Sequence, residues 1–278
     1  MKKIISDSGC DIRKELAKEI GLNLELIPLN LQIGDEHFID DETLDINYYL
    51  EKMVGSSTPP KTSAPSPELY AKSMEDTDSA FVLTLSSKLS GSYNSANLGK
   101  DLALEKDPSK FIHVIDSKTA AAGQNSITLK LGELIASNLS NNEIVEKITE
   151  FIDNMRTYVI LEKYDNLVKT GRLNPAIAKV ASIMSLKPLC KAIDGEIQMI
   201  DKARGYQRTL KKLVDLILED KLDFENRILS ISHVKCYEKA LETKEAILNK
   251  VTFKDVVITD TTGLCSTYAN IEGIVVSF

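Results

Sequence analysis

The stretch AFVLTL at residues 80–85, followed by SSKLSGSYNSA at residues 86–96, decides the fold. An apolar run without alternation is typical of a strand that is buried on both faces, as in parallel sheets. The serine-rich segment after it leads into a helical pattern. A strand, a polar loop and a helix in this order predict a unit of a parallel sheet, with the loop at the carboxyl end of the strand, where open α/β sheets bind ligands.

The same succession occurs on both sides of this stretch. Residues 3–5 (KII) precede a polar loop and an amphipathic segment that ends at Gly21, and residues 111–116 (FIHVID) precede a helical pattern that reaches about Leu139. Strands that alternate with helices pair in parallel through crossovers. We therefore expect an α/β protein whose first half is a Rossmann-like domain with a parallel sheet.

The pattern changes at Thr157, where the strand-like run TYVIL follows a helical pattern at residues 142–155. Asp194-Gly195 then separates two apolar runs, and this dipeptide favours a tight hairpin between antiparallel strands. Further helical patterns (206–218 and 237–248) alternate with strand patterns (228–232 and 256–259). We expect two domains, an N-terminal α/β domain at residues 1–156 and a C-terminal mixed α+β domain at residues 157–278.

The composition limits the class of protein. The chain has 278 residues, of which 43% are hydrophobic and 27% charged, as in soluble globular proteins. Its net charge of -7 disfavours global binding to nucleic acid. No apolar run approaches the roughly 18 residues of a membrane helix, and no secretory signal is visible. We therefore expect a cytoplasmic protein without an integral membrane segment, and reduced thiols at the scattered cysteines Cys10, Cys190, Cys236 and Cys265.

Polar segments follow each of the three predicted parallel strands. Ser90 is a natural N-cap, so the amides of Gly91 and Ser92 would face an anionic group, although many N-cap serines only cap their own helix. Asp7-Ser8 and Asp116-Ser117 hold the corresponding positions after the first and third strands. Their carboxylates are possible metal ligands or bases, but such pairs more often bind the amides of their own loop.

The segment at residues 55–67 is rich in proline and carries six hydroxyl side chains, among them Thr62 and Ser63. It is either a surface linker or a ligand-binding loop. The second alternative follows from its prolines, which stiffen the backbone that holds the hydroxyls.

Enzyme signatures are mostly missing. The chain has no G-x-S-x-G elbow, no G-x-x-x-x-G-K-[ST] phosphate loop and no G-x-G-x-x-G fingerprint. His113 lies in an apolar strand, and His233 with Cys236 would form only half of a metal site. We expect no metal. An enzyme remains the alternative, either a stand-alone small-molecule phosphotransferase or a hydrolase, with Asp7, Ser90 and Tyr268 in a site between the domains.

Basic residues gather in the second half of the chain. They form either an ordinary solvated face or a docking face. The cluster consists of Lys169, Arg172, Lys187, Lys202, Arg204, Arg208, Lys211 and Lys212.

Six short segments, taken in order, resemble the DegV family of bacterial lipid-binding proteins. They are Ile5-Ser6-Asp7-Ser8-x-x-Asp11, Thr62-Ser63-x-Pro65-Ser66, Ser86-Ser87-Lys88-Leu89-Ser90-Gly91-Ser92-Tyr93-x-Ser95-Ala96, Val114-Ile115-Asp116-Ser117, Gly171-Arg172-Leu173 and Lys187-Pro188-Leu189. Each segment is a weak signal alone, but the order and spacing fit from Ile4 to Arg204, which is most of the chain.

This resemblance implies a two-domain α/β fold that encloses one long-chain fatty acid, with no other cofactor. It implies a non-catalytic lipid-binding protein that serves as the fatty-acid-binding subunit of a bacterial fatty acid kinase. Such a subunit presents its acid to a separate ATP-binding kinase protein, and the acyl phosphate feeds phospholipid synthesis. By the resemblance, Thr62 and Ser90 hold the carboxylate, and Arg172 and Arg204 lie near the face that docks to the kinase.

The chain departs from the family pattern at three positions. Tyr268 stands where the family usually has a histidine, and its hydroxyl can still donate a hydrogen bond to the carboxylate. Thr170 replaces the first of two glycines before Arg172, and Ala121 replaces a serine in the loop after Asp116-Ser117. Supporting roles in the binding loops are expected for Asp7, Ser8, Ser63, Gly91, Ser92, Asp116 and Ser117.

Overall fold

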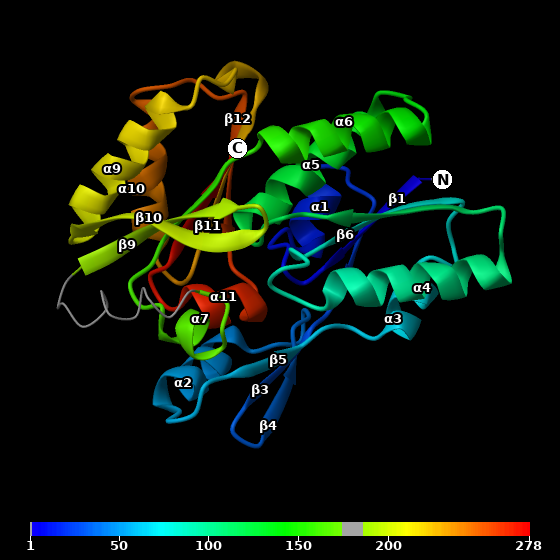
Figure 1. Ribbon diagram of the computed structural model, residues 1–278, viewed down its shortest axis with the longest axis horizontal. Helices are drawn as coiled ribbons and strands as arrows, with labels where there is room; N and C mark the ends of the chain where they lie inside the picture. Colours follow the sequence, from blue (N-terminus) through cyan, green and yellow to red (C-terminus); the bar gives the residue numbers. More distant parts are fainter. Residues whose placement is uncertain (1, 174–185) are drawn as a thin grey trace.

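The first half of the chain forms the parallel sheet that the sequence predicts, in the strand order β2-β1-β6-β7 (Figure 1). The computed structural model describes residues 2–173 and 186–278. Two pairs of helices cover the two faces of this sheet. The strands are β1 (Lys2–Asp7), β2 (Leu24–Ile27), β6 (Ser79–Thr84) and β7 (Phe111–Asp116), and the helices are α3 (Pro67–Ser73), α4 (Ser92–Lys106), α5 (Ala122–Ala136) and α6 (Asn141–Asn154).

Successive residues of the central strands face opposite pairs of helices. Ile4 and Phe81 pack toward α5 and α6, whereas Ile5 and Val82 pack toward α3 and α4. Because both faces are buried, the central strands need an unbroken apolar run, as residues 80–85 have. The strand order reverses between β1 and β6, so the loops after these two strands flank the point where open α/β sheets bind ligands.

The second half contains the mixed sheet that we expected, in the order β10-β9-β8-β13-β11-β12. Only β11 and β12 pair in parallel. The predicted hairpin joins β9 to β10, with positive φ angles of 50° at Asp194 and 85° at Gly195. The elements are β8 (Thr157–Ile160), β9 (Leu186–Ile193), β10 (Glu196–Arg204), α9 (Tyr206–Glu219), the short 3-10 helix η2 (Phe224–Asn226), β11 (Ile228–His233), α10 (Tyr237–Leu248), β12 (Asp255–Asp260), α11 (Gly263–Ala269) and β13 (Ile274–Ser277).

A small third sheet, in the order β4-β3-β5, was not expected (Figure 1). Its last strand lies inside the proline-rich segment, which is therefore neither a simple linker nor a plain loop. Although it belongs to the first half of the chain, this region packs through α2 against α11. The division at residues 156 and 157 stays a prediction. The remaining elements are α1 (Lys14–Glu19), β3 (Asn30–Ile33), β4 (Glu36–Ile39), α2 (Ile46–Gly55), β5 (Lys61–Ser63) and α7 (Asp165–Lys169).

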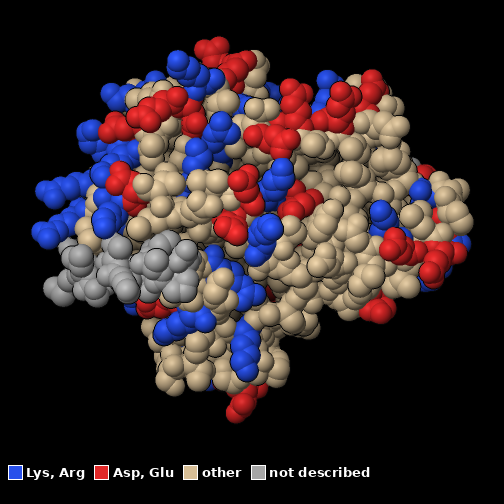
Figure 2. Space-filling view, viewed as in Figure 1, with Lys and Arg blue, Asp and Glu red and all other residues tan. Residues whose placement is uncertain are grey.

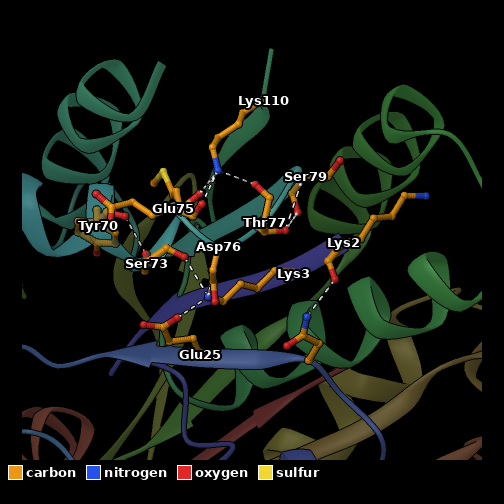
Figure 3. A network of polar contacts seen from close by, with 12 residues as sticks. Lys2, Lys3, Glu25, Tyr70, Ser73, Glu75, Asp76, Thr77, Ser79 and Lys110 are labelled. Carbon is orange, nitrogen blue, oxygen red and sulfur yellow. Dashed lines mark hydrogen bonds and ion pairs between the residues drawn. The ribbon is translucent and has the colours of Figure 1, made fainter. Parts of the chain in front are cut away.

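A network of ion pairs joins the amino ends of the parallel strands (Figure 3). Lys3 is 6% exposed, and its Nζ lies 2.7 Å from Asp76 Oδ1 and 2.6 Å from Glu25 Oε2. Burial lowers the pKa of Lys3, but its bonds to Asp76 and Glu25 outweigh burial and raise that pKa. Lys110 donates to three backbone carbonyls between α3 and β6. These lysines stabilise the end of the sheet that lies opposite the binding loops.

Candidate functional site

An apolar cavity of about 90 Å³ lies between the carboxyl edge of the parallel sheet and the six-stranded sheet. Apolar side chains of β8, β13, α7 and α11 line most of it, together with the loops that follow β6 and β7. From β8 the lining residues are Thr157 and Val159, and Leu161 follows directly after the strand. This spacing of two is the period with which a strand presents side chains to one face.

Four polar residues, Thr62, Ser90, Arg172 and Tyr268, line the same cavity and are all half-buried. Thr62 Oγ1 of β5 lies 2.8 Å from the hydroxyl of Tyr268 in α11. The guanidinium of Arg172 lies over the Tyr268 ring, 5.8 Å from its centroid. Arg172 also donates to the carbonyl oxygens of Thr170, at 2.7 Å, and Leu89, at 3.3 Å. The structure therefore brings hydroxyls and one cation together at a partly exposed end of the cavity.

Ser90 lines the cavity, but the expectation that it is the N-cap of α4 is wrong. The helix begins at Ser92 with Gly91 as its N-cap, because the Gly91 carbonyl accepts the first helical bond, from Ser95. Ser90 Oγ instead accepts the Ser92 amide at 3.2 Å and lies 3.0 Å from Ser92 Oγ. The Ser92 amide is thus not free for a ligand.

Asp7 holds the loop after β1 and the start of the loop after β6 through hydrogen bonds to their backbone amides. It is fully buried, and its carboxylate accepts from the amides of Gly9 and Leu85 and from Gln124 Nε2, at 2.8–3.1 Å. Burial raises the pKa of Asp7 to about 6, although these hydrogen bonds oppose the shift. Within the described residues, Asp7 shares no direct hydrogen bond with Ser90 or Tyr268, and it does not line the cavity that those two residues line.

The other expected supporting residues do not line the apolar cavity; they bind backbone groups of their own or neighbouring segments, or are exposed. Ser8 Oγ accepts the amide of Leu29 at 3.1 Å. Asp116 accepts the amides of Ser87 and Lys118, each at 3.0 Å, and Ser117 Oγ donates to the carbonyl of Thr119 at 3.0 Å. Ser63, at the end of β5, is exposed. The interpretation of these residues as partners of loop amides is thus favoured over direct contact with a ligand.

Arg204 does not share the cavity with Arg172. It is exposed at the end of β10, on an edge where basic side chains gather near α9 (Figure 2). Other members of the predicted basic cluster are paired: Lys187 with Glu162, Lys211 with Asp215, and Lys212 with Asp201. Among residues 2–173 and 186–278, no acidic side chain pairs with Arg204.

His233 and Cys236, which the sequence suggested as half of a metal site, make contacts within the protein instead. His233 Nδ1 accepts the amide of Cys236 at 3.4 Å, and burial lowers the pKa of His233. The part of the chain that the structure describes contains no group of three or more side chains placed to hold a metal ion. Across the same residues, each helix is too short or too polar to cross a bilayer.

Sequence reasoning missed the roles of Thr119 and Thr157 in the cavity wall. Two signals were present. Thr119 follows the third parallel strand, at the binding edge of the sheet, and Thr157 begins the alternation that continues at Val159 and Leu161.

Comparison with known proteins agrees with this arrangement. A family model described as "Uncharacterised protein, DegV family" matches residues 1–278. The chain belongs to the DegV family. This DegV chain is 36% identical over 277 residues to a DegV domain-containing protein of Streptococcus gordonii, across 99% of this chain and 98% of the relative. The family and the α/β fold that the sequence predicted are confirmed.

Two solved structures resemble the DegV chain over its whole length. One is a DegV family protein of Ruminococcus gnavus with vaccenic acid, at a TM-score of 0.93 and 35% identity, covering 100% of this chain and 99% of that one. The other is the Fatty Acid Kinase (Fak) B3 protein of Streptococcus pneumoniae loaded with linoleic acid, at a TM-score of 0.94 and 33% identity, with the same coverage.

Proposed function

We propose that this protein binds one long-chain fatty acid, with the carboxylate held by Thr62, Ser90 and Tyr268 and the tail in the apolar cavity. The observation that carries the proposal is the composition of the cavity. Among residues 2–173 and 186–278, its lining is apolar except for the hydroxyls and the guanidinium of Arg172 at a half-exposed end and for two threonines in its wall. Two structurally similar proteins hold vaccenic and linoleic acid, which supports the same class of ligand here.

The polar end has hydrogen-bond donors to spare for a carboxylate. Thr62 and Tyr268 carry two hydroxyl protons, and the bond between them uses only one. Arg172 has five N–H donors, of which two are bound to backbone carbonyls. Removing a carboxylate from water costs several kcal/mol, and each hydrogen bond to a charged group returns about 1.5–3 kcal/mol. Hydroxyls and a guanidinium together are therefore sufficient to hold it.

The apolar part of the cavity suits a hydrocarbon tail. Thr157 and Leu161 are four residues apart along an extended segment, so the lining they mark is about 13 Å long. Burial of each methylene group contributes about 0.8 kcal/mol. The tail therefore supplies most of the affinity, and the polar end fixes the direction in which the acid enters.

We propose further that the protein presents its acid to a separate ATP-binding kinase, which converts the carboxylate to an acyl phosphate. The half-exposed polar end leaves the carboxylate within reach of a partner. Arg172 is placed to neutralise the negative charge that develops there, and exposed Arg204 offers a contact for an acidic surface of the kinase. The chain itself then acts as a carrier and not as a catalyst.

Mass spectrometry of the denatured protein, purified from a bacterial host, tests the binding proposal. We expect close to one equivalent of long-chain fatty acid. A preparation that holds none, and that takes up none when acid is added, would overturn the proposal.

A phosphorylation assay with the kinase tests the carrier role. We expect acyl phosphate only when chain, kinase, ATP and fatty acid are all present. Arg204→Glu should slow phosphorylation by at least tenfold while the bound fatty acid stays stoichiometric, and Lys18→Glu, on exposed α1, is the control. Turnover of ATP by the chain alone, or an unchanged rate with Arg204→Glu, would contradict the carrier role or the docking role, respectively.

A further inference from the structure

Three residues separate the apolar cavity from a second cavity. Thr119, Thr157 and Ala192 line both the apolar cavity and a neighbouring one of about 360 Å³. Residues that line two cavities form a wall one side chain thick. The lining of the second cavity is mixed: charged side chains, among them Lys118, Asp153 and Arg156, stand beside the apolar side chains of Ile152, Met155 and Ile193.

This wall stands at the end of the apolar cavity that lies away from the polar residues. Leu161 leads into α7, which packs on α11, the helix that carries Tyr268. Thr157 lies four residues back along the chain, about 13 Å away. The antiparallel pairing of Tyr158 with Lys191 places Thr157 opposite Ala192, so both wall residues from the second sheet meet at this end.

The hydroxyls of the wall are satisfied among themselves. Thr119 Oγ1 donates to Thr157 Oγ1 at 3.0 Å, Thr157 shares a bond of 3.1 Å with Ser277 Oγ, and Ser277 donates to the carbonyl of Arg156 at 2.9 Å. With Thr157 donating to Ser277, every hydroxyl proton is used, and the wall need not offer a free donor to the tail. Gly123 leaves the space that the Thr119 side chain occupies, since a Cβ at position 123 would lie 2.2 Å from Thr119 Oγ1.

We infer that the wall of Thr119, Thr157 and Ala192 sets the longest acyl chain that this protein retains. The inference rests on the proposed function. A tail whose methyl end reaches the wall is fully buried, whereas a longer tail must displace the wall or leave methylene groups outside. Thr157→Ala joins the two cavities and admits longer tails, and Ala192→Leu fills the end of the cavity and favours shorter ones.

Competition between straight-chain saturated fatty acids that differ by two carbons tests the inference. The delipidated full-length protein is incubated with an equimolar mixture, and the bound acids are measured by mass spectrometry. One methylene corresponds to about a fourfold change in affinity, so a shift of two carbons changes the ratio of neighbouring acids by about fifteenfold. We expect that shift toward longer acids for Thr157→Ala and toward shorter acids for Ala192→Leu.

A control separates the shape of the wall from its hydrogen bonds. Ser277→Ala breaks the hydroxyl chain behind the wall and leaves Thr119, Thr157 and Ala192 unchanged, so it should keep the wild-type length preference. If Thr157→Ala does not fold, the competition experiment with Ala192→Leu alone tests the inference. Folded, loaded variants with the wild-type preference would overturn the inference and leave the proposed function intact, whereas a wild-type protein that binds no acid would remove both.

Discussion

Replacing Thr62 with valine removes one hydroxyl from the polar end of the cavity and keeps the shape of the side chain. The lost group is the one that lies 2.8 Å from the Tyr268 hydroxyl and lines the cavity. A hydrogen bond to a charged carboxylate contributes about 1.5–3 kcal/mol, so the dissociation constant for a fatty acid should rise about 10- to 150-fold. Loss of the neutral bond to Tyr268 should lower the free energy of unfolding by only about 1 kcal/mol.

The assay compares two ligands that differ only in the head group. Delipidated wild-type and Thr62→Val proteins are titrated by calorimetry with a fatty acid and with the fatty alcohol of the same length. The alcohol carries no charge, and a neutral hydrogen bond contributes about 0.5–1.5 kcal/mol, so its affinity should fall by about 2- to 10-fold. The larger loss for the acid identifies a contact to the carboxylate.

Thr58→Val is the matched control, because Thr58 is exposed in the same segment and its hydroxyl lies 3.1 Å from Ser56 Oγ. It should bind both ligands as the wild-type protein does. If folded Thr62→Val keeps the wild-type affinity for the fatty acid, Thr62 does not hold the carboxylate.

Two further predictions concern stability. Since burial raises the pKa of Asp7 from 3.8 to about 6, the native state binds more protons than the unfolded state between these values, and Asp7 should add about 1 kcal/mol of stability as the pH falls from 7 to 5. Burial also raises the pKa of Asp11 to about 6, so urea unfolding at both pH values should show a larger total gain, of which Asp7→Asn should remove about 1 kcal/mol. An undiminished gain in the variant would assign all of it to other groups. Lys3→Met should lower the free energy of unfolding by about 1–3 kcal/mol, because it leaves the carbonyl oxygen of Ser73 without its buried donor. Lys106→Met breaks only an exposed ion pair with Glu75, so it should lower the free energy of unfolding by less than about 0.5 kcal/mol. Equal losses from the two lysine variants would contradict a special role for the buried network.

The parallel sheet and the β9–β10 hairpin could be predicted from the sequence because their signals are local. Residues 80–85 are apolar throughout since both faces of β6 are buried, and Asp194-Gly195 has the positive φ angles that a tight hairpin needs. The third sheet gave no such signal. Its strands have three or four residues each, and β5 follows two prolines, so neither length nor alternation marks it.

The polar end of the cavity could not be predicted from local pattern. Thr62 and Tyr268 are 206 residues apart, and their contact depends on the tertiary fold that brings β5 beside α11. Both were named through the family resemblance and not by spacing. Ser90 illustrates the opposite error: a serine before a helix predicts an N-cap, but the first helical hydrogen bond is accepted by the Gly91 carbonyl, one residue later.

A crystal structure with a fatty acid that carries bromine on its terminal carbon tests the central claim most directly. We predict an anomalous peak for bromine beside Thr157, and carboxylate density within hydrogen-bonding distance of Thr62 Oγ1 and Ser90 Oγ. A bromine peak beside Tyr268, or acyl density outside the apolar cavity, would contradict the account.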